Sequence, residues 1–181
     1  MAINRKIVLG ICGSVAAIET PEIVRELSRR GIDVECVMTR SSKRIVHPDV
    51  LEWASGNKAI TKLTGNLEHV RLCGVRGEAS LLLICPVTAN TISKIANGIG
   101  DTPVTTFAIT AIGSKIPLIL VPAMHLSMYE NPFVVDNIKR LKDNGVKFIE
   151  PRIEETKAKL ANIDEIVDGV LNVIGKNEPN A

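Results

Sequence analysis

The chain has 181 residues and a formal net charge of +2; 45% of its residues are hydrophobic and only 3% are aromatic. This length suits one domain, and the apolar fraction is large enough to fill an aliphatic core. The near balance of charge, the lack of a basic run and the few aromatic side chains argue against a nucleic-acid surface. No apolar run approaches the ~20 residues of a membrane span, so we expect a cytoplasmic protein without a membrane segment.

The cysteines suggest neither disulfides nor a metal site. Cys12, Cys36 and Cys85 lie in or next to apolar strand-like runs, and none of the four, Cys73 included, belongs to a CxxC pair. We therefore expect small buried hydrophobic side chains in a reducing compartment. No structural metal is expected, because closely spaced ligand pairs are missing.

The first forty residues predict a βαβ unit. Residues 6–12 form a β-rich run, residues 15–30 carry a helical apolar stripe that Pro21 kinks or restarts, and residues 32–39 form a second strand. This spacing is typical of parallel strands joined by a right-handed crossover. The turn at 13–14 does not complete the dinucleotide-binding glycine pattern, but its small residues suit a phosphate or a flat ring.

Residues 81–98 are the most informative stretch of the chain. Residues 81–85 are continuously apolar, as in a strand buried on both faces, and we expect Pro86 to end the strand's hydrogen-bond ladder. Residues 88–91 then offer side-chain oxygens at a predicted helix start, and Gly98 closes the helix. Taken alone, this stretch fits a ligand-binding turn and a purely structural, well-capped turn equally well.

The later elements alternate in the same way and predict an α/β fold. We expect a doubly wound, mainly parallel sheet in a flavodoxin- or Rossmann-like three-layer sandwich over residues 1–174, with a flexible tail at 175–181. The further predicted elements are a helical segment starting at Pro48, an extended piece at 59–63, a helix or strand at 104–112, a strand at 116–122, a loop at 123–132, a helix at 133–142, a strand at 146–149, a charged linker or flap at 151–161 and a helix at 164–174.

Polar or small residues follow four of the predicted strands, at 13–14, 39–42, 86–91 and 122–125. The carboxyl ends of parallel strands meet at one edge of a sheet, where open α/β proteins bind their ligands. These four turns therefore predict one ligand site.

With these turns in view, the sequence resembles the flavin-dependent Cys decarboxylases, in particular the phosphopantothenoylcysteine decarboxylases of coenzyme A synthesis. It looks especially like the decarboxylase half of archaeal bifunctional enzymes, without the ligase half that follows there. The matching motifs keep their order and spacing from residue 6 to about residue 151. They are Gly13-Ser-Val-Ala-Ala17, Ser55-Gly-Asn57, His69-Val-x-Leu72, Pro86-x-Thr-Ala-Asn-Thr-Ile-x-Lys-Ile-Ala-Asn-Gly98 and Pro122-Ala-Met-x5-Tyr-Glu-Asn-Pro132.

The resemblance implies FMN bound between the subunits of a homotrimer, often assembled further into a homododecamer. It implies that the turn after the first strand lies along the flavin, that Ser41 or Ser42 lies near the phosphate or ribityl chain, and that the turn after the third strand holds the ring and ribityl side. The implied cofactor-binding residues are Gly13, Ser14, Val15, Thr39, Ser41, Ser42, Thr88, Ala89, Asn90 and Thr91.

The reaction implied by the resemblance is FMN-dependent decarboxylation of 4'-phosphopantothenoylcysteine to 4'-phosphopantetheine. Direct loss of CO2 would leave an unstabilised carbanion, so the family route first oxidises the CH2–SH group to a thioaldehyde, then loses CO2 and restores the thiol by reduction. His69 matches the family's active-site histidine and is the predicted general base. Without the surrounding motif, a surface or capping histidine would be the better interpretation.

Two departures from the family pattern affect the predicted site. His125 stands where the decarboxylases usually carry an asparagine that binds the substrate carboxylate; we assign it to the substrate together with Met124 and Asn90. A histidine there could bind the carboxylate or signal a different substrate. The flap lacks the family's cysteine and glycines, which leaves Lys157 or Lys159 as a candidate proton donor or phosphate clamp, or as plain solvated charge.

Two alternative functions stay open. One is a flavin prenyltransferase, for which FMN is the substrate, although no Arg and Tyr pair for a prenyl phosphate is evident. The other is a non-catalytic flavin-binding regulatory subunit, which the missing flap cysteine keeps open. For the decarboxylase, the expected partners are the small-molecule substrate, further copies of the chain and a separate phosphopantothenate–cysteine ligase.

Overall fold

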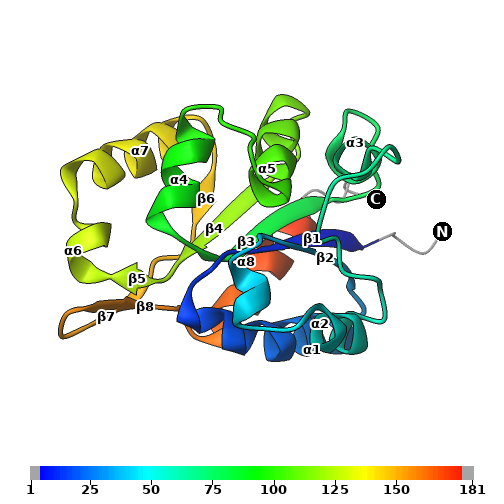
Figure 1. Cartoon of the computed structure of the whole chain (residues 1–181), viewed down its shortest axis with the longest axis horizontal. Coiled ribbons are helices and arrows are strands. Elements are labelled where there is room, and N and C mark those ends of the chain that lie inside the picture. Colours follow the sequence, from blue (N-terminus) through cyan, green and yellow to red (C-terminus); the bar gives the residue numbers. More distant parts are fainter. Residues whose placement is uncertain (1–4, 177–181) are drawn as a thin grey trace.

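The computed structural model describes residues 5–176 and is built on a sheet of five parallel strands (Figure 1). The strand order is β2-β1-β3-β4-β6. The chain first adds β2 on one side of β1 and then crosses to the other side of β1, where it adds β3, β4 and β6 in turn. This reversal makes the carboxyl edge between β1 and β3 the topological switch point of the sheet. The strands are β1 (Lys6–Ile11), β2 (Asp33–Met38), β3 (Leu81–Val87), β4 (Leu118–Pro122) and β6 (Lys147–Phe148).

Helices cover both faces of the sheet, which confirms the predicted three-layer, doubly wound fold (Figure 1). Two 3-10 turns, η1 (Val15–Glu19) and η2 (Ser42–Arg44), follow β1 and β2. One face carries α1 (Thr20–Arg29), α2 (Pro48–Ser55) and α8 (Ile163–Lys176); the other carries α3 (Glu68–Cys73), α4 (Ala89–Ala96), α5 (Pro103–Gly113) and α7 (Pro132–Asp143).

Successive side chains of the strands feed two separate aliphatic cores. Ile7 and Leu9 pack with α1 and α8, whereas Val8 and Leu82 pack with α4 and α5 on the opposite face. A strand buried on both faces needs apolar residues at every position, which explains the uninterrupted apolar run of β3.

Local sequence signals explain most helix starts. Pro21 lies in the first turn of α1 after η1, which confirms the predicted restart. The segment at 104–112, for which helix and strand were both open, is helix α5. Its N-terminus has Pro103 in the first turn and a reciprocal capping box between Thr102 and Thr105.

The predicted end of the third strand at Pro86 is wrong. β3 continues through Pro86 to Val87, with a shift of register against β4 between Ile84 and Val87. A proline can stay in a strand where such an irregularity removes the need for its N–H. Its carbonyl still accepts a hydrogen bond from the N–H of Cys12, at 3.2 Å.

Two segments predicted as loop or linker form a second, small antiparallel sheet. β5 (Met124–His125) pairs with β8 (Lys157–Lys159), which pairs with β7 (Arg152–Glu154). The predicted loop at 123–132 therefore contains β5 and a short helix, α6 (Leu126–Tyr129), and the predicted linker or flap at 151–161 is a hairpin. These strands are only two or three residues long, too short for a clear periodic pattern.

The predicted flexible tail at 175–181 starts two residues too early, because residues 175 and 176 still belong to α8, which ends at Lys176. The remainder of that prediction, 177–181, lies outside the described residues. Among residues 5–176, the helices are either too short or too polar to cross a membrane.

Candidate active site

The turn after β1 contacts the turns after β2, β3 and β4. Gly13 approaches the turn after β2 so closely that a Cβ placed on it would lie 2.5 Å from the Cβ of Ser41. The Sγ of Cys12 donates to Oγ1 of Thr91, after β3, at 3.3 Å. The hydroxyl of Ser14 donates to the carbonyl of Ala123, after β4, at 3.0 Å. The predicted convergence of four turns at one edge is therefore present in a single copy of the chain.

The turn after β2 uses its own polar groups to hold its shape. The N–H of Ser42 donates to Oγ1 of Thr39 at 3.2 Å, and the hydroxyl of Ser42 donates to the carbonyl of Thr39 at 2.9 Å. Both residues are buried, whereas Ser41 is exposed. Of the two serines predicted to approach the ligand, Ser41 is thus the one with an accessible side chain.

The turn after β3 is the capped start of α4. Oγ1 of Thr88 accepts from the N–H of Thr91 at 3.4 Å and lies 3.3 Å from the hydroxyl of Thr91. Ala89 and Thr91 are buried, so they support the turn from below, while Asn90 is exposed at its tip. The predicted helix start is confirmed, and Asn90 is its accessible polar side chain.

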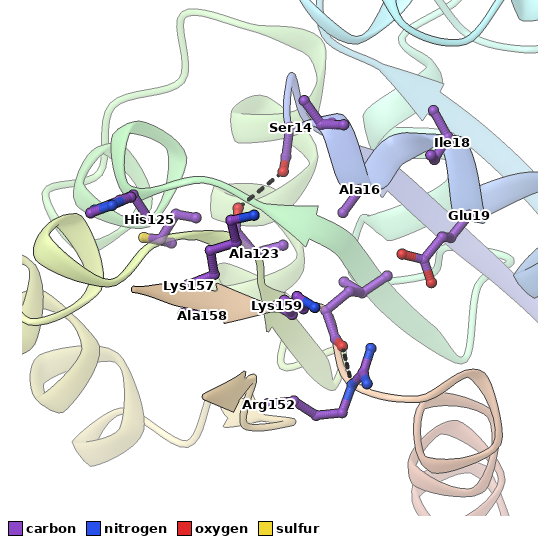
Figure 2. A pocket seen from close by; sticks show the side chains of 13 residues that line it. Ser14, Ala16, Ile18, Glu19, Ala123, His125, Arg152, Lys157, Ala158 and Lys159 are labelled. Atoms are coloured by element: carbon purple, nitrogen blue, oxygen red, sulfur yellow. Dashed lines mark hydrogen bonds between the residues drawn. The ribbon is translucent and has the colours of Figure 1, made fainter. Parts of the chain in front are cut away.

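A cavity of about 500 Å³ opens beside the Ser14–Ala123 hydrogen bond (Figure 2). η1 forms one wall, β5 with the preceding Ala123 another, and the β7–β8 hairpin the third. Among the predicted site residues it brings together Ser14, Val15, Met124 and His125. Its size and its mixture of apolar walls with a few polar groups are typical of a small-molecule site.

Two η1 side chains at the cavity are apolar and unusually exposed. Val15 is 75% exposed and Ile18 is 61% exposed, and both line the cavity. Ser14, immediately before them, adds a hydroxyl at the same edge. This wall can pack against a flat apolar ring while the adjacent turns donate hydrogen bonds to its polar rim.

The hairpin gives the cavity an excess of positive charge. Arg152, Lys157 and Lys159 line it, and Glu19 is the carboxylate among its lining residues (Figure 2). Glu154 lies just outside; it forms an ion pair with Arg152 at 3.1 Å and another with Lys159.

His125 is the N-cap of α6, and its Nδ1 faces Ser127. This nitrogen accepts from the N–H of Ser127 at 3.3 Å and lies 2.8 Å from the Ser127 hydroxyl. A neutral ring whose Nδ1 accepts these hydrogen bonds carries its proton on Nε2, which is then a hydrogen-bond donor. An asparagine side chain at this position would also present an N–H donor.

His69 lies away from this cavity in its own chain. It belongs to α3, which packs on α5 at the end of the sheet where β1 begins, whereas the β5–β8–β7 sheet is at the opposite end (Figure 1). Its ring meets Phe107 edge-on, with centroids 6.4 Å apart. Its Nδ1 is buried and has no hydrogen-bond partner within residues 5–176. One copy of the chain does not bring His69 to the other predicted site residues.

The four cysteines are free and buried. Burial raises the pKa of Cys12 to about 11, and burial likewise raises the pKa values of Cys36 and Cys73 to about 12. Burial raises the pKa of Cys85 as well. Because the thiolate is the nucleophilic form, burial makes these four side chains poor nucleophiles, and none of them lies in the β7–β8 hairpin.

Several lining residues were missed or left undecided by the sequence analysis. Glu19 belongs to none of the matching motifs, and Arg152 lies in the segment predicted as a charged linker, so neither residue is predicted to line the site. Lys157 and Lys159 were named without a decision between a functional and a solvated role. In β8 the two lysines flank the buried Ala158 and lie on one face, an alternation of three residues that is too short to predict a strand.

The fold and the edge cavity define a doubly wound α/β protein with a ligand site at the switch point. The chain belongs to the flavoprotein family, whose model matches residues 1–175. It is 52% identical over 170 residues to the coenzyme A biosynthesis bifunctional protein CoaBC of Thermococcus kodakarensis, covering 93% of this chain but 42% of that protein. It is 30% identical to a probable phosphopantothenoylcysteine decarboxylase of Streptococcus mutans, covering 92% of this chain and 97% of that protein.

Solved structures of cysteine decarboxylases share the fold. The peptidyl-cysteine decarboxylase EpiD superposes with a TM-score of 0.80 at 31% identity, covering 92% of this chain and 98% of EpiD. A mutant PPC decarboxylase complexed with pantothenoylaminoethenethiol superposes with a TM-score of 0.75 at 25% identity, covering 92% and 96% of the two chains. The chain thus spans less than half of the bifunctional relative and nearly all of the single-function decarboxylases.

Proposed function

We propose that this chain catalyses the FMN-dependent decarboxylation of 4'-phosphopantothenoylcysteine to 4'-phosphopantetheine. The observation that carries the proposal is the meeting of four post-strand turns beside a cavity of about 500 Å³. The nearly full-length likeness to a probable phosphopantothenoylcysteine decarboxylase supports the choice of substrate.

The residues of the edge fit a flavin. Exposed Val15 and Ile18 offer an apolar surface for the isoalloxazine ring, and Ser14 and Asn90 offer polar groups for its rim. Gly13 and Ser41 approach so closely that the chain allows no side chain between these two turns. When bound, FMN would supply the hydride acceptor and donor that decarboxylation of a cysteine requires.

The chain's own residues would position the substrate and move protons. In its neutral form, His125 can donate Nε2–H to the carboxylate, the role that an asparagine amide has in the related family. His69 remains the proposed general base, acting on a substrate bound to another copy of the chain. A His69 remote from its own cavity supports this division between copies.

A homotrimer or homododecamer is the proposed assembly, because only a second copy could supply His69. The proposed flavoprotein domain covers residues 1–174, and we propose that it works together with a phosphopantothenate–cysteine ligase in a reducing compartment such as the cytoplasm. The four free cysteines support the choice of compartment.

The test is turnover of the purified, FMN-loaded chain with 4'-phosphopantothenoylcysteine. We expect equal amounts of CO2 and 4'-phosphopantetheine, and we expect His69→Ala to lower kcat by at least ~100-fold, as loss of a general base does. Formation of prenylated FMN from dimethylallyl phosphate, without CO2 release, would favour the prenyltransferase instead. Binding of FMN with no turnover of cysteine substrates would favour a regulatory subunit.

A further inference from the structure

The β7–β8 hairpin holds three cations, and two of them share one carboxylate as their ion-pair partner. Glu154 places Oε1 3.1 Å from Nη1 of Arg152, and its Oε2 forms an ion pair with Nζ of Lys159. Both carboxylate oxygens are thereby engaged. Arg152 also donates its Nε–H to the carbonyl of Leu160 at 2.9 Å, which fixes it along the hairpin.

Lys157 differs from Arg152 and Lys159 in its ion pairing. Within residues 5–176 it forms no ion pair, although Glu154 is its partner across the hairpin in the β7–β8 register. The other carboxylate at the cavity, Glu19, comes from η1 on the side nearer Lys159 and Arg152 (Figure 2). Lys157 therefore has no ion-pair partner among residues 5–176, and its charge acts on Glu154 only at longer range, where it helps the ion-paired Lys159 to lower the pKa of that carboxyl.

The side chain of Lys157 points toward the predicted ligand site. In Figure 2 its side chain reaches from β8 toward the Ser14–Ala123 hydrogen bond, at the edge where the four turns meet. On the other side of β8, in register, its neighbour is His125. An unpaired ammonium beside an apolar wall attracts an oxyanion more strongly than a lysine in open solvent does.

We propose that Lys157 binds an oxyanion of the substrate and that the ion-paired Lys159 does not. This inference rests on the proposed function, whose substrate carries two oxyanions: the cysteine-derived carboxylate and the phosphate. The shared chemistry is a charge-assisted hydrogen bond from Nζ to an anionic oxygen.

The test uses the FMN-loaded full chain and ligands that undergo no turnover. Phosphopantothenoylserine carries both anions, pantothenoylserine only the carboxylate, phosphopantetheine only the phosphate, and pantetheine neither. Their dissociation constants are measured by calorimetry for the wild type, Lys157→Met and Lys159→Met. The second variant is the matched control, because it removes the same charge from the same strand.

We expect Lys157→Met to raise the dissociation constant of phosphopantothenoylserine by about 10-fold and that of pantetheine by less than about 2-fold. Lys159→Met should change either dissociation constant by less than about 3-fold. If the loss persists with pantothenoylserine, the bound group is the carboxylate; if it persists with phosphopantetheine, it is the phosphate. Equal losses in both lysine variants, or an equal loss for pantetheine, would overturn the inference. Failure of the wild type to bind phosphopantothenoylserine would instead overturn the proposed function.

Discussion

At the scale of single residues, the geometry of the site depends on a glycine as well as on polar side chains. Gly13 has no Cβ, and for that reason the turn after β1 can lie against Ser41. Ser14 and Cys12, on either side of it, then reach the turns after β4 and β3. The close approach at Gly13 is thus the contact on which the geometry of the whole edge depends.

Gly13→Ala should therefore lower both the stability of the protein and its affinity for FMN. The new Cβ would lie 2.5 Å from the Cβ of Ser41, so the two turns must separate, and we expect a loss of about 1–3 kcal/mol in the free energy of unfolding. FMN affinity should fall with it. The measurement is urea denaturation, with FMN binding by fluorescence.

Gly113→Ala is the matched control, because a Cβ there meets no atom within 4 Å and Gly113 ends helix α5. Its free energy of unfolding should change by less than about 1 kcal/mol, since alanine is the better helix former. Two variants of equal stability and equal FMN affinity would contradict the importance of the Gly13 contact.

At the scale of elements, most long helices and buried strands were predictable, although α5 was left open between helix and strand, and the short pieces were not predictable. The apolar run of β3 and the stripes of α1, α7 and α8 are long enough to show their periods, and Thr88 marks the start of α4 as expected. β5, β7 and β8 have two or three residues each, and they exist because β8 pairs on both sides. Such pairing depends on tertiary contact, which a local pattern does not encode.

The same limit explains what was found and missed in the site. Ser14, Val15 and His125 lie in motifs next to long elements, so their position at the edge was predictable. The presence of Glu19 and Arg152 at the cavity depends on how the hairpin folds over η1. So does the difference between Lys159, which is ion-paired, and Lys157, which is not. Whether a lysine is ion-paired cannot be deduced from its place in the sequence alone.

At the scale of the whole molecule, one copy holds an incomplete set of the proposed catalytic groups. The cavity is at the carboxyl edge of the sheet, and α3 with His69 is at the other end (Figure 1). Exposed apolar residues occur at both places: Val15 and Ile18 at the cavity, and Leu67 and Val70 around His69. In a closed ring of copies, one surface can cover the other.

Complementation between two inactive variants tests this arrangement. Ser14→Trp should fill the cavity and His69→Ala should remove the base, so each variant alone should be inactive. Co-expressed in one oligomer, they should recover up to about one quarter of wild-type activity, because half of the cavities and half of the histidines are intact. Mixed oligomers no more active than the separate variants would contradict a site shared between copies.

The most direct measurement is a titration of the flavin-free wild-type chain with FMN, followed by the quenching of FMN fluorescence. The proposed site predicts saturation at one FMN per chain, a yellow protein after removal of free cofactor, and loss of both in Ser14→Trp. A wild-type chain that stays colourless and shows no saturable uptake of FMN would contradict it.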